Sequence, residues 1–219
     1  MHGKRTVVLI NPNTSPDTTA MLAAAARTAF GSRGAFEVRA VTAAAGPRMI
    51  VTPEELRASA AQVLAAALRA GPQGVAAFVV GAFGDPGVEE LRTVVPVPVV
   101  GIGEAALVEA AHTRFGVVTT TPALARPIAA RIEVLGLADR CTGVRCTEGD
   151  PETLSSRPDI LRERLAAAVE SSVVRDGAHA VVIGGGPLTR AGAALQERFA
   201  VPVIVPVAAA CRRIEQLLG

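Results

Sequence analysis

The sequence predicts an α/β fold built from two similar halves, each a parallel sheet flanked by helices. Short runs rich in Val and Ile alternate along the chain with Ala- and Leu-rich segments of helical spacing. The runs are apolar throughout, which is typical of strands that are buried on both faces. In addition, Val97–Ala106 and Val201–Ala210 read as two versions of one sequence. The alternation predicts parallel sheets with covering helices, and the repeat predicts two of them.

Each strand is predicted from a β-branched run that is bounded by Gly, Pro or Asn. The runs are Thr6–Ile10, Glu37–Val41, Gly74–Val80, Val97–Ile102, Phe115–Thr119, Thr142–Cys146, Ala178–Ile183 and Val201–Val205. The segments between them carry Ala and Leu at helical spacing and are predicted as helices. They include Pro53–Ala70, Glu104–Thr113, Pro122–Leu135, Arg157–Asp176, Leu188–Phe199 and Val207–Leu218.

Four helix starts place a capping side chain directly before a proline, at Ser15, Thr52, Asp85 and Thr121. A side-chain oxygen there accepts an N–H of the first helical turn, and proline has no N–H to leave unpaired. Thr52 and Glu55 have the spacing of a capping box. Three of the caps follow a strand, so the carboxyl ends of the strands open onto helix N-termini. In open α/β sheets, ligands bind at that edge.

Two further pairs of segments extend the repeat. They are Val7–Pro16 with Gly116–Pro122, and Ala76–Pro86 with Ala180–Pro187. Three pairs in the same order predict a duplicated chain, with a first half at 1–112 and a second at 113–205. We expect the last helix, 206–219, to pack back on the first half. Because no Gly/Ser-rich linker separates the halves, they should be tightly joined, with the site in the cleft between them.

Composition and charge exclude several classes of partner. The 219 residues are 50% hydrophobic, and 22 Lys and Arg balance 20 Asp and Glu, which leaves a net charge of +2. A charge this small cannot neutralise a phosphate backbone, so nucleic acid is not expected as a partner. The chain has neither a signal-peptide core nor an apolar run of about 18 residues, so we expect a cytoplasmic protein without membrane contact. A small molecule is the expected partner.

Neither a metal nor an organic cofactor is expected. Cys141, Cys146 and Cys211 have no metal-binding spacing, and their odd number argues against a disulfide framework. Gly101–Ala106 follows a strand and fits the glycine pattern of dinucleotide-binding proteins. The acidic residue that such proteins place about 20 positions further on is missing, because Gly116–Thr121 occupies that region.

Four motifs together resemble the aspartate/glutamate/hydantoin racemase family, and its hydantoin and allantoin racemase branch in particular. They are Ile10–Ser15, Gly81–Gly87, Pro98–Ala105 and Gly184–Leu188, and they stand in the family's order across nearly the whole chain. The resemblance implies two pseudo-symmetric Rossmann-like subdomains with a small substrate in the cleft between them. It also implies a homo-oligomer and cofactor-independent proton transfer.

The chain departs from the family at the two positions that carry this chemistry. In the family, two cysteines stand on opposite sides of the substrate, and they remove and return a proton at its α-carbon. The residues at those positions here are Ala82 and Gly185. Neither side chain exchanges a proton, so the two-thiol mechanism is not expected.

Two carboxylates are candidates for the missing catalytic groups. Asp85 follows the turn that contains Ala82, and Glu104 follows the fourth predicted strand, so both should stand near the cleft. Each also has a structural interpretation. Asp85 can cap a helix that starts at Pro86, and Glu104 can complement the N-terminal dipole of its own helix.

Polar loops and glycines supply the candidate substrate contacts. They are Asn11, Asn13, Thr14, Ser15, Ala82, Phe83, Thr119, Thr120, Thr121, Gly185, Gly186 and Pro187. Hydroxyl, amide and backbone N–H donors suit a carboxylate, imide or enolate oxygen, although Ser15 and Thr121 could serve as helix caps alone. The sequence thus predicts a racemase- or isomerase-type enzyme acting on a small carboxylate or a cyclic ureide or imide. The alternatives are a decarboxylase or other lyase, a hydrolase of the same superfamily, and a small-molecule binder without catalysis.

Overall fold

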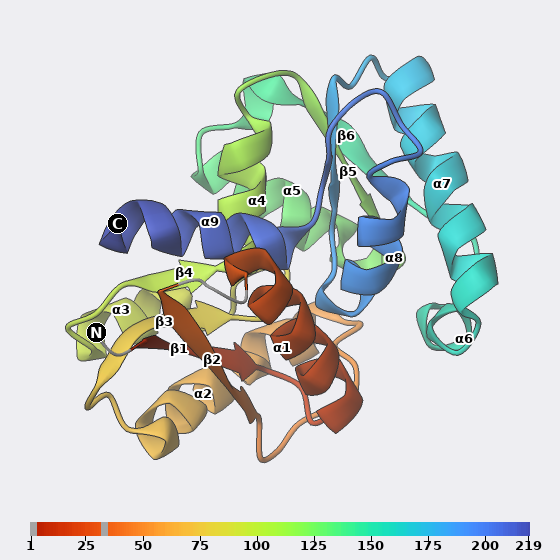
Figure 1. Ribbon diagram of the computed structural model, residues 1–219. Helices are drawn as coiled ribbons and strands as arrows, with labels where there is room; N and C mark the ends of the chain where they lie inside the picture. Colours follow the sequence, from red (N-terminus) through yellow and green to blue (C-terminus); the bar gives the residue numbers. More distant parts are fainter. Residues whose placement is uncertain (1–3, 32–34) are drawn as a thin grey trace.

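The computed structural model describes residues 4–31 and 35–219, which form two four-stranded parallel sheets (Figure 1). The sheets have the same connectivity, β2-β1-β3-β4 and β6-β5-β7-β8. The first contains β1 (Arg5–Asn11), β2 (Phe36–Thr42), β3 (Val75–Val80) and β4 (Val99–Gly101). The second contains β5 (Phe115–Thr119), β6 (Cys141–Cys146), β7 (Ala180–Ile183) and β8 (Val203–Ile204). The predicted fold class, two similar parallel sheets with covering helices, is confirmed.

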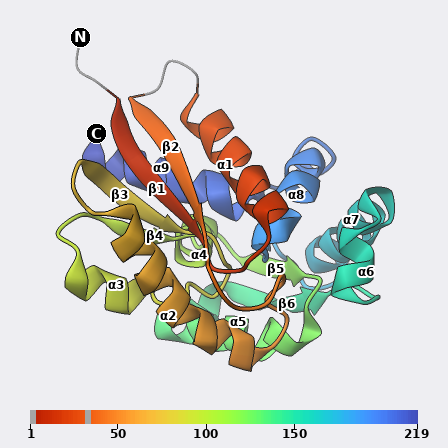
Figure 2. The same cartoon turned by 90° about the horizontal axis from the view of Figure 1, so that it is seen from below.

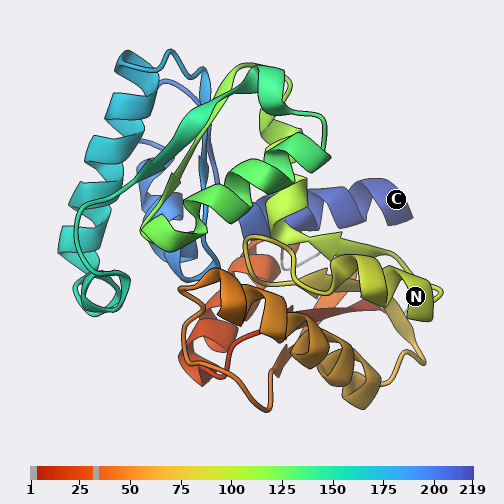
Figure 3. The same cartoon turned by 180° about the vertical axis from the view of Figure 1, so that it is seen from behind.

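Helices flank both sheets (Figures 1 and 3). The first half has α1 (Pro16–Phe30), α2 (Pro53–Ala70), α3 (Val88–Val94) and α4 (Ile102–Ala110). The second has α5 (Ala125–Val134), α6 (Pro151–Ser155), α7 (Pro158–Val174) and α8 (Thr189–Leu195), and α9 (Pro206–Leu218) ends the chain. Alternate side chains of β1 point to opposite faces of the sheet. Val7 and Leu9 pack in the core with α1 and α9, whereas Val8 and Ile10 pack with α2 and α3.

The structure departs from the sequence prediction mainly at short elements. α6 spans 5 residues and is not predicted, and α3 spans 7 residues and is indicated only by the expected helix start at Pro86, because periodicity needs more than about two turns to show. β4 and β8 are shorter than predicted. Pro98 and Pro202 precede them, and each accepts a ladder hydrogen bond through its carbonyl but cannot donate one.

The two halves exchange their last helices. α9 follows the second sheet and packs on α1 and α4 and against β4 of the first sheet, and α4 follows the first sheet and packs against β7 of the second. One hydrophobic cluster consequently runs through both halves, from Leu22 and Phe83 to Phe115, Ile128 and Ile214. The division into subdomains 1–112 and 113–205 stays a prediction. In the described part of the chain, no helix has the length and hydropathy needed to cross a membrane.

Candidate active site

The loops that carry Ala82 and Gly185 line one cavity between the two halves. We call it the inner cavity. Its lining is Asn13, Met49, Ile50, Leu56, Gly81–Phe83, Thr120, Thr121, Leu124, Ile128, Pro151, Ser155, Leu161 and Gly184–Leu188. Its volume is about 60 Å³, well below the roughly 300–1,000 Å³ of most ligand sites. A ligand of ordinary size therefore places only its reacting part there and extends beyond it.

Backbone contact between the halves fixes one wall of the inner cavity. A Cβ atom on Gly186 would lie 2.6 Å from the carbonyl oxygen of Gly81, so only glycine fits at that position. Gly185 is different, because its φ of 168° is extended and suits any residue. A Cβ atom there would lie 3.1 Å from side-chain atoms of Leu188, which can shift. Position 185 accepts a side chain, and position 186 does not.

Asn13 brings an unpaired amide donor to the inner cavity. Its Oδ1 accepts the backbone N–H of Ser15 at 2.9 Å, which fixes the orientation of the amide, and also accepts Asn11 Nδ2 at 2.8 Å. Among the described residues, nothing accepts a hydrogen bond from Asn13 Nδ2. Because Asn13 lines the cavity, this Nδ2 group is available to an acceptor on a ligand.

Four of the predicted substrate contacts lie outside the inner cavity, because their polar groups serve the loops themselves. Asn11 is fully buried and donates to Ser15 O at 3.1 Å and to Thr19 Oγ1 at 3.0 Å. Ser15 caps α1 by accepting the N–H of Thr18 at 3.2 Å. The other two are Thr14, whose hydroxyl donates to Gly46 O at 3.4 Å, and Thr119, whose hydroxyl accepts the N–H of Thr121 at 3.4 Å.

The second half contributes hydroxyl groups at the end of β5 and on α6. Thr120, Thr121 and Ser155 all line the inner cavity, and their hydroxyls have no partner among the described residues. The interpretation of Thr121 as a helix cap is wrong, since its side chain makes no capping bond. The cavity thus combines an amide donor from one half with hydroxyls from the other.

Asp85 does not line the inner cavity; it caps α4 from inside the protein. Its buried carboxylate accepts the N–H of Gly103 at 2.8 Å and of Glu104 at 2.6 Å. The predicted cap on a helix starting at Pro86 is wrong, because α3 begins at Val88 and Gly87 precedes it. Asp85 also has a left-handed φ of 53°. These bonds occupy its carboxylate, so its position favours a structural role over catalysis.

The titration of Asp85 should affect stability between pH 5 and 7. Burial raises its pKa from 3.8 to about 6, despite the two N–H donors and the nearby Arg131. The folded state therefore binds this proton more tightly than the unfolded state, and the contribution of Asp85 to stability rises as the pH falls through 6. We expect the free energy of unfolding of wild type, relative to Asp85→Asn, to be about 1 kcal/mol larger at pH 5 than at pH 7. Urea denaturation of both proteins at both pH values checks this, and parallel pH dependence of the two proteins would contradict it.

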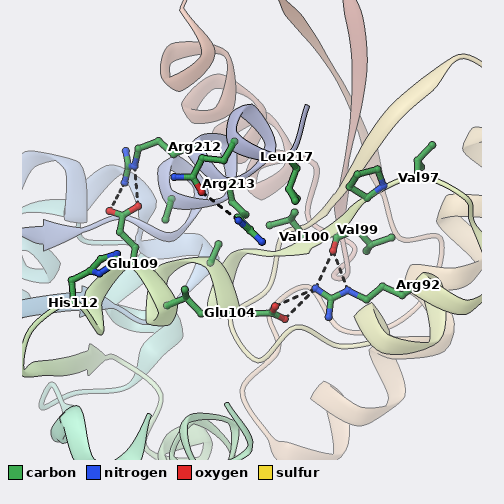
Figure 4. Close-up of a pocket in the computed structure, with 15 residues that line it drawn as sticks. Arg92, Val97, Val99, Val100, Glu104, Glu109, His112, Arg212, Arg213 and Leu217 are labelled. Atoms are coloured by element: carbon green, nitrogen blue, oxygen red, sulfur yellow. Dashed lines mark hydrogen bonds and ion pairs between the residues drawn. The ribbon is translucent and has the colours of Figure 1, made fainter. Parts of the chain in front are cut away.

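Glu104 lies in a different part of the protein. It contributes to a hollow of about 570 Å³ between β4, α4 and α9 (Figure 4). Its carboxylate contacts Arg92 at 3.2 Å and Arg131 of α5 at 2.8 Å, and Arg131 also contacts Glu89 at 3.3 Å. Glu104 thus joins α4 to the second half through Arg131. A catalytic role in the inner cavity is not supported by this position.

No ionisable side chain occurs among the described residues that line the inner cavity. The cysteines all lie elsewhere, Cys141 and Cys146 on β6 and Cys211 in α9, and burial raises the pKa of each thiol. The one sulfur atom in the described lining is the thioether of Met49. In the described part of the chain, no group of His, Cys, Asp and Glu residues could hold a metal ion.

The sequence patterns miss the apolar wall of the inner cavity. Met49 and Ile50 come from the long loop between β2 and α2, and Leu56 comes from α2 itself. In the second half, Leu124, Ile128 and Leu161 belong to turns and helices. The signal that could have been used is the pair of bulky apolar residues in the loop before the Thr52 capping box, because loops rarely need them for their own stability.

The fold and the cavity define an α/β protein of two similar halves, with a cavity between the carboxyl ends of its two parallel sheets. This chain belongs to the Asp/Glu/hydantoin racemase family, whose model matches residues 7–214. It is 34% identical to the hydantoin racemase of Rhizobium meliloti over 215 residues, which covers 96% of this chain and 88% of that protein.

Solved structures agree with the family. The allantoin racemase from Klebsiella pneumoniae superposes with a TM-score of 0.90 at 32% identity, covering 97% of this chain and 87% of that chain. The maleate cis-trans isomerase of Nocardia farcinica has a TM-score of 0.72 at 18% identity, and the match covers 99% of this chain and 93% of that chain. At that identity the isomerase shows a shared fold only.

Proposed function

We propose that this protein binds a small cyclic ureide or imide in the inner cavity and exchanges the proton on its α-carbon, without a cofactor and without paired thiols. The observation that carries the proposal is the lining of the cavity. Unpaired donors come from both halves, Asn13 Nδ2 from one and the Thr120 hydroxyl from the other, and no charged group accompanies them. The relatives named as hydantoin and allantoin racemases support the same class of substrate.

The neutral lining favours a ureide or imide over a carboxylate. A buried carboxylate without a cation is costly, because burial disfavours the charged form. The ring of a hydantoin offers carbonyl acceptors and N–H donors without a formal charge, which suits amide and hydroxyl partners. For the same reason, decarboxylation of a dicarboxylate is disfavoured, since no cation of the described lining would hold the acid.

Proton exchange in this cavity uses water in place of the thiols. One water molecule takes the proton from the α-carbon and becomes hydronium, and the electron pair moves onto the carbonyl oxygen. A second water returns a proton to the carbon and leaves hydroxide, which the hydronium then neutralises. The donors of Asn13 and Thr120 stabilise the enolate oxygen. Because water is a weak base, we expect the exchange to be slow. The lack of an ionisable side chain also favours a second candidate function, a small-molecule binder without catalysis.

Incubation with hydantoin in deuterated water separates the two candidates. Deuterium that enters the α-carbon faster than in protein-free buffer supports the enzyme. A rise in melting temperature with hydantoin, but no added exchange, supports the binder. Alkylation of the half-buried thiols of Cys141 and Cys146 is the control, and it should leave the exchange unchanged because no cysteine occurs in the described lining of the cavity. The proposal would be contradicted if the protein showed no added exchange and no thermal shift with any cyclic ureide.

Removing the hydroxyl of Thr120 should weaken the binding of the ligand without destabilising the fold. Thr120→Val keeps the shape of the side chain and deletes a hydroxyl that has no protein partner in the described part of the chain. We expect the Kd for hydantoin to rise about three- to tenfold, the usual contribution of one hydrogen bond. The matched control is Thr147→Val, which deletes a buried, unpaired hydroxyl that does not line the cavity. Calorimetry should show an unchanged Kd for the control; equal effects of both variants would contradict the assignment of Thr120.

The homo-oligomer expected from the family stays a prediction, and light scattering on the purified protein checks it.

A further inference from the structure

A second space adjoins the inner cavity, and we call it the vestibule. It has a volume of about 330 Å³ and lies between α1, α7 and α8. Ser155, Leu161 and Pro187 line both the vestibule and the inner cavity, so the two spaces are neighbours that meet at these residues. α1 and α8 lie side by side where the two halves meet (Figure 2). A ring held in the inner cavity would extend the substituent on its α-carbon into this space.

The vestibule contains one unpaired charge of each sign. Asp17 of α1 and Arg190 of α8 both line it, and neither has a hydrogen-bond or ion-pair partner among the described residues. A third charged group, Arg162, is already paired with Asp159 at 2.7 Å. The rest of the lining is mainly apolar or small, as at Met21. A ligand in the vestibule therefore meets a free carboxylate from the first half and a free guanidinium from the second.

We propose that Asp17 and Arg190 determine which substituent the substrate carries, and that they select an uncharged polar group such as a carboxamide. A carboxamide accepts a hydrogen bond from Arg190 through its oxygen and donates one to Asp17 through its N–H. This inference rests on the proposed function, because the ring must occupy the inner cavity for the substituent to reach the vestibule.

The competing substituents each leave one charge unsatisfied. A carboxylate is attracted by Arg190 and repelled by Asp17. An ammonium group is attracted by Asp17 and repelled by Arg190. An alkyl chain returns no hydrogen bond to either side chain. Because both side chains are exposed, its penalty is limited to the part of their water that it displaces. Asp17 and Arg190 are thus specificity-determining residues that do not touch the reacting carbon.

Binding of four hydantoins to the full chain tests the proposal by isothermal titration calorimetry. They are unsubstituted hydantoin and the hydantoins derived from glutamine, glutamate and leucine. The glutamine and glutamate compounds have nearly the same shape, but the substituent ends in an amide in the first and in a carboxylate in the second. We expect the glutamine compound to bind about three- to fivefold more tightly than the glutamate compound, the size expected for exposed charges.

Asp17→Asn should reduce this ratio of affinities by favouring the acid, and Arg190→Gln should increase it. Arg164→Gln, whose parent side chain pairs with Glu148 outside the vestibule, is the charge-matched control and should not change the ratio.

The outcomes separate this inference from the proposed function. If no hydantoin binds, including the unsubstituted one, the proposed function fails and the vestibule assignment fails with it. If unsubstituted hydantoin binds but the glutamate or leucine compound binds as tightly as the glutamine compound, the vestibule assignment alone is wrong. An equal loss of affinity for all four compounds in Asp17→Asn and Arg190→Gln would also overturn it, because it would indicate a structural effect.

Discussion

Cysteines placed at both Ala82 and Gly185 are expected to raise α-proton exchange in hydantoin by about 100-fold or more over the wild-type chain. Both positions line the inner cavity, and they belong to different halves. In Ala82→Cys/Gly185→Cys, one thiolate can take the proton from the α-carbon while the opposing thiol supplies another. Positioned acid–base groups typically contribute 10²- to 10⁴-fold, and wild type has none in the described lining.

The geometry permits this double variant. Ala82 already carries a Cβ atom, and position 185 has an extended backbone that clashes only with the flexible side chain of Leu188. The matched control is Ala82→Ser/Gly185→Ser, which has nearly the same shape but no thiolate near neutral pH. Proton NMR in deuterated water gives the exchange rate, and optical rotation of an enantiomerically pure hydantoin gives racemisation. A folded cysteine variant that exchanges no faster than the serine variant would contradict the placement of the two positions.

Gly186→Ala is expected to lower the free energy of unfolding by about 3 kcal/mol, at the upper end of the usual cost of overpacking. The new Cβ atom would meet the backbone carbonyl of Gly81 at 2.6 Å, and a backbone oxygen cannot turn aside as the end of a flexible side chain can. Gly185→Ala, one residue away, is the matched control. Its Cβ atom meets only the side chain of Leu188, so we expect a change below about 1 kcal/mol.

Urea denaturation of the two glycine variants, followed by circular dichroism, measures this difference. The destabilised Gly186→Ala variant should also bind hydantoin more weakly, because the same backbone contact forms a wall of the inner cavity. Equal stabilities for the two variants would show that the halves do not meet at Gly81 and Gly186 as described.

The fold could be predicted from the sequence wherever the signal is local. The bounds of α2 and its Thr52–Glu55 capping box match the prediction, because proline, cap and apolar spacing all act within one helix. Asp85 shows the limit of such reasoning. It precedes a proline like the other caps, yet its carboxylate caps α4, a helix that begins 17 residues further along the chain. Gly101 and Gly103 allow this approach, since a Cβ atom on either would lie within 3.0 Å of the Asp85 carboxylate.

The candidate site could be predicted in part, for a similar reason. Ala82, Gly185 and Thr120 follow strands of the two sheets, and parallel strands bring their carboxyl ends to one edge. Whether a polar residue in such a loop faces the ligand or braces the loop depends on hydrogen bonds that spacing does not encode. Asn11 and Asn13 are two residues apart, but only Asn13 lines the cavity.

A crystal structure of the wild-type chain with bound hydantoin would show which residues contact the ring. We expect a ring in the inner cavity between Ala82 and Gly185, within hydrogen-bond distance of Asn13 Nδ2 and the Thr120 hydroxyl, with no thiol in contact. A ring in the hollow beside Glu104, or one that touches Cys141, Cys146 or Cys211, would contradict this expectation.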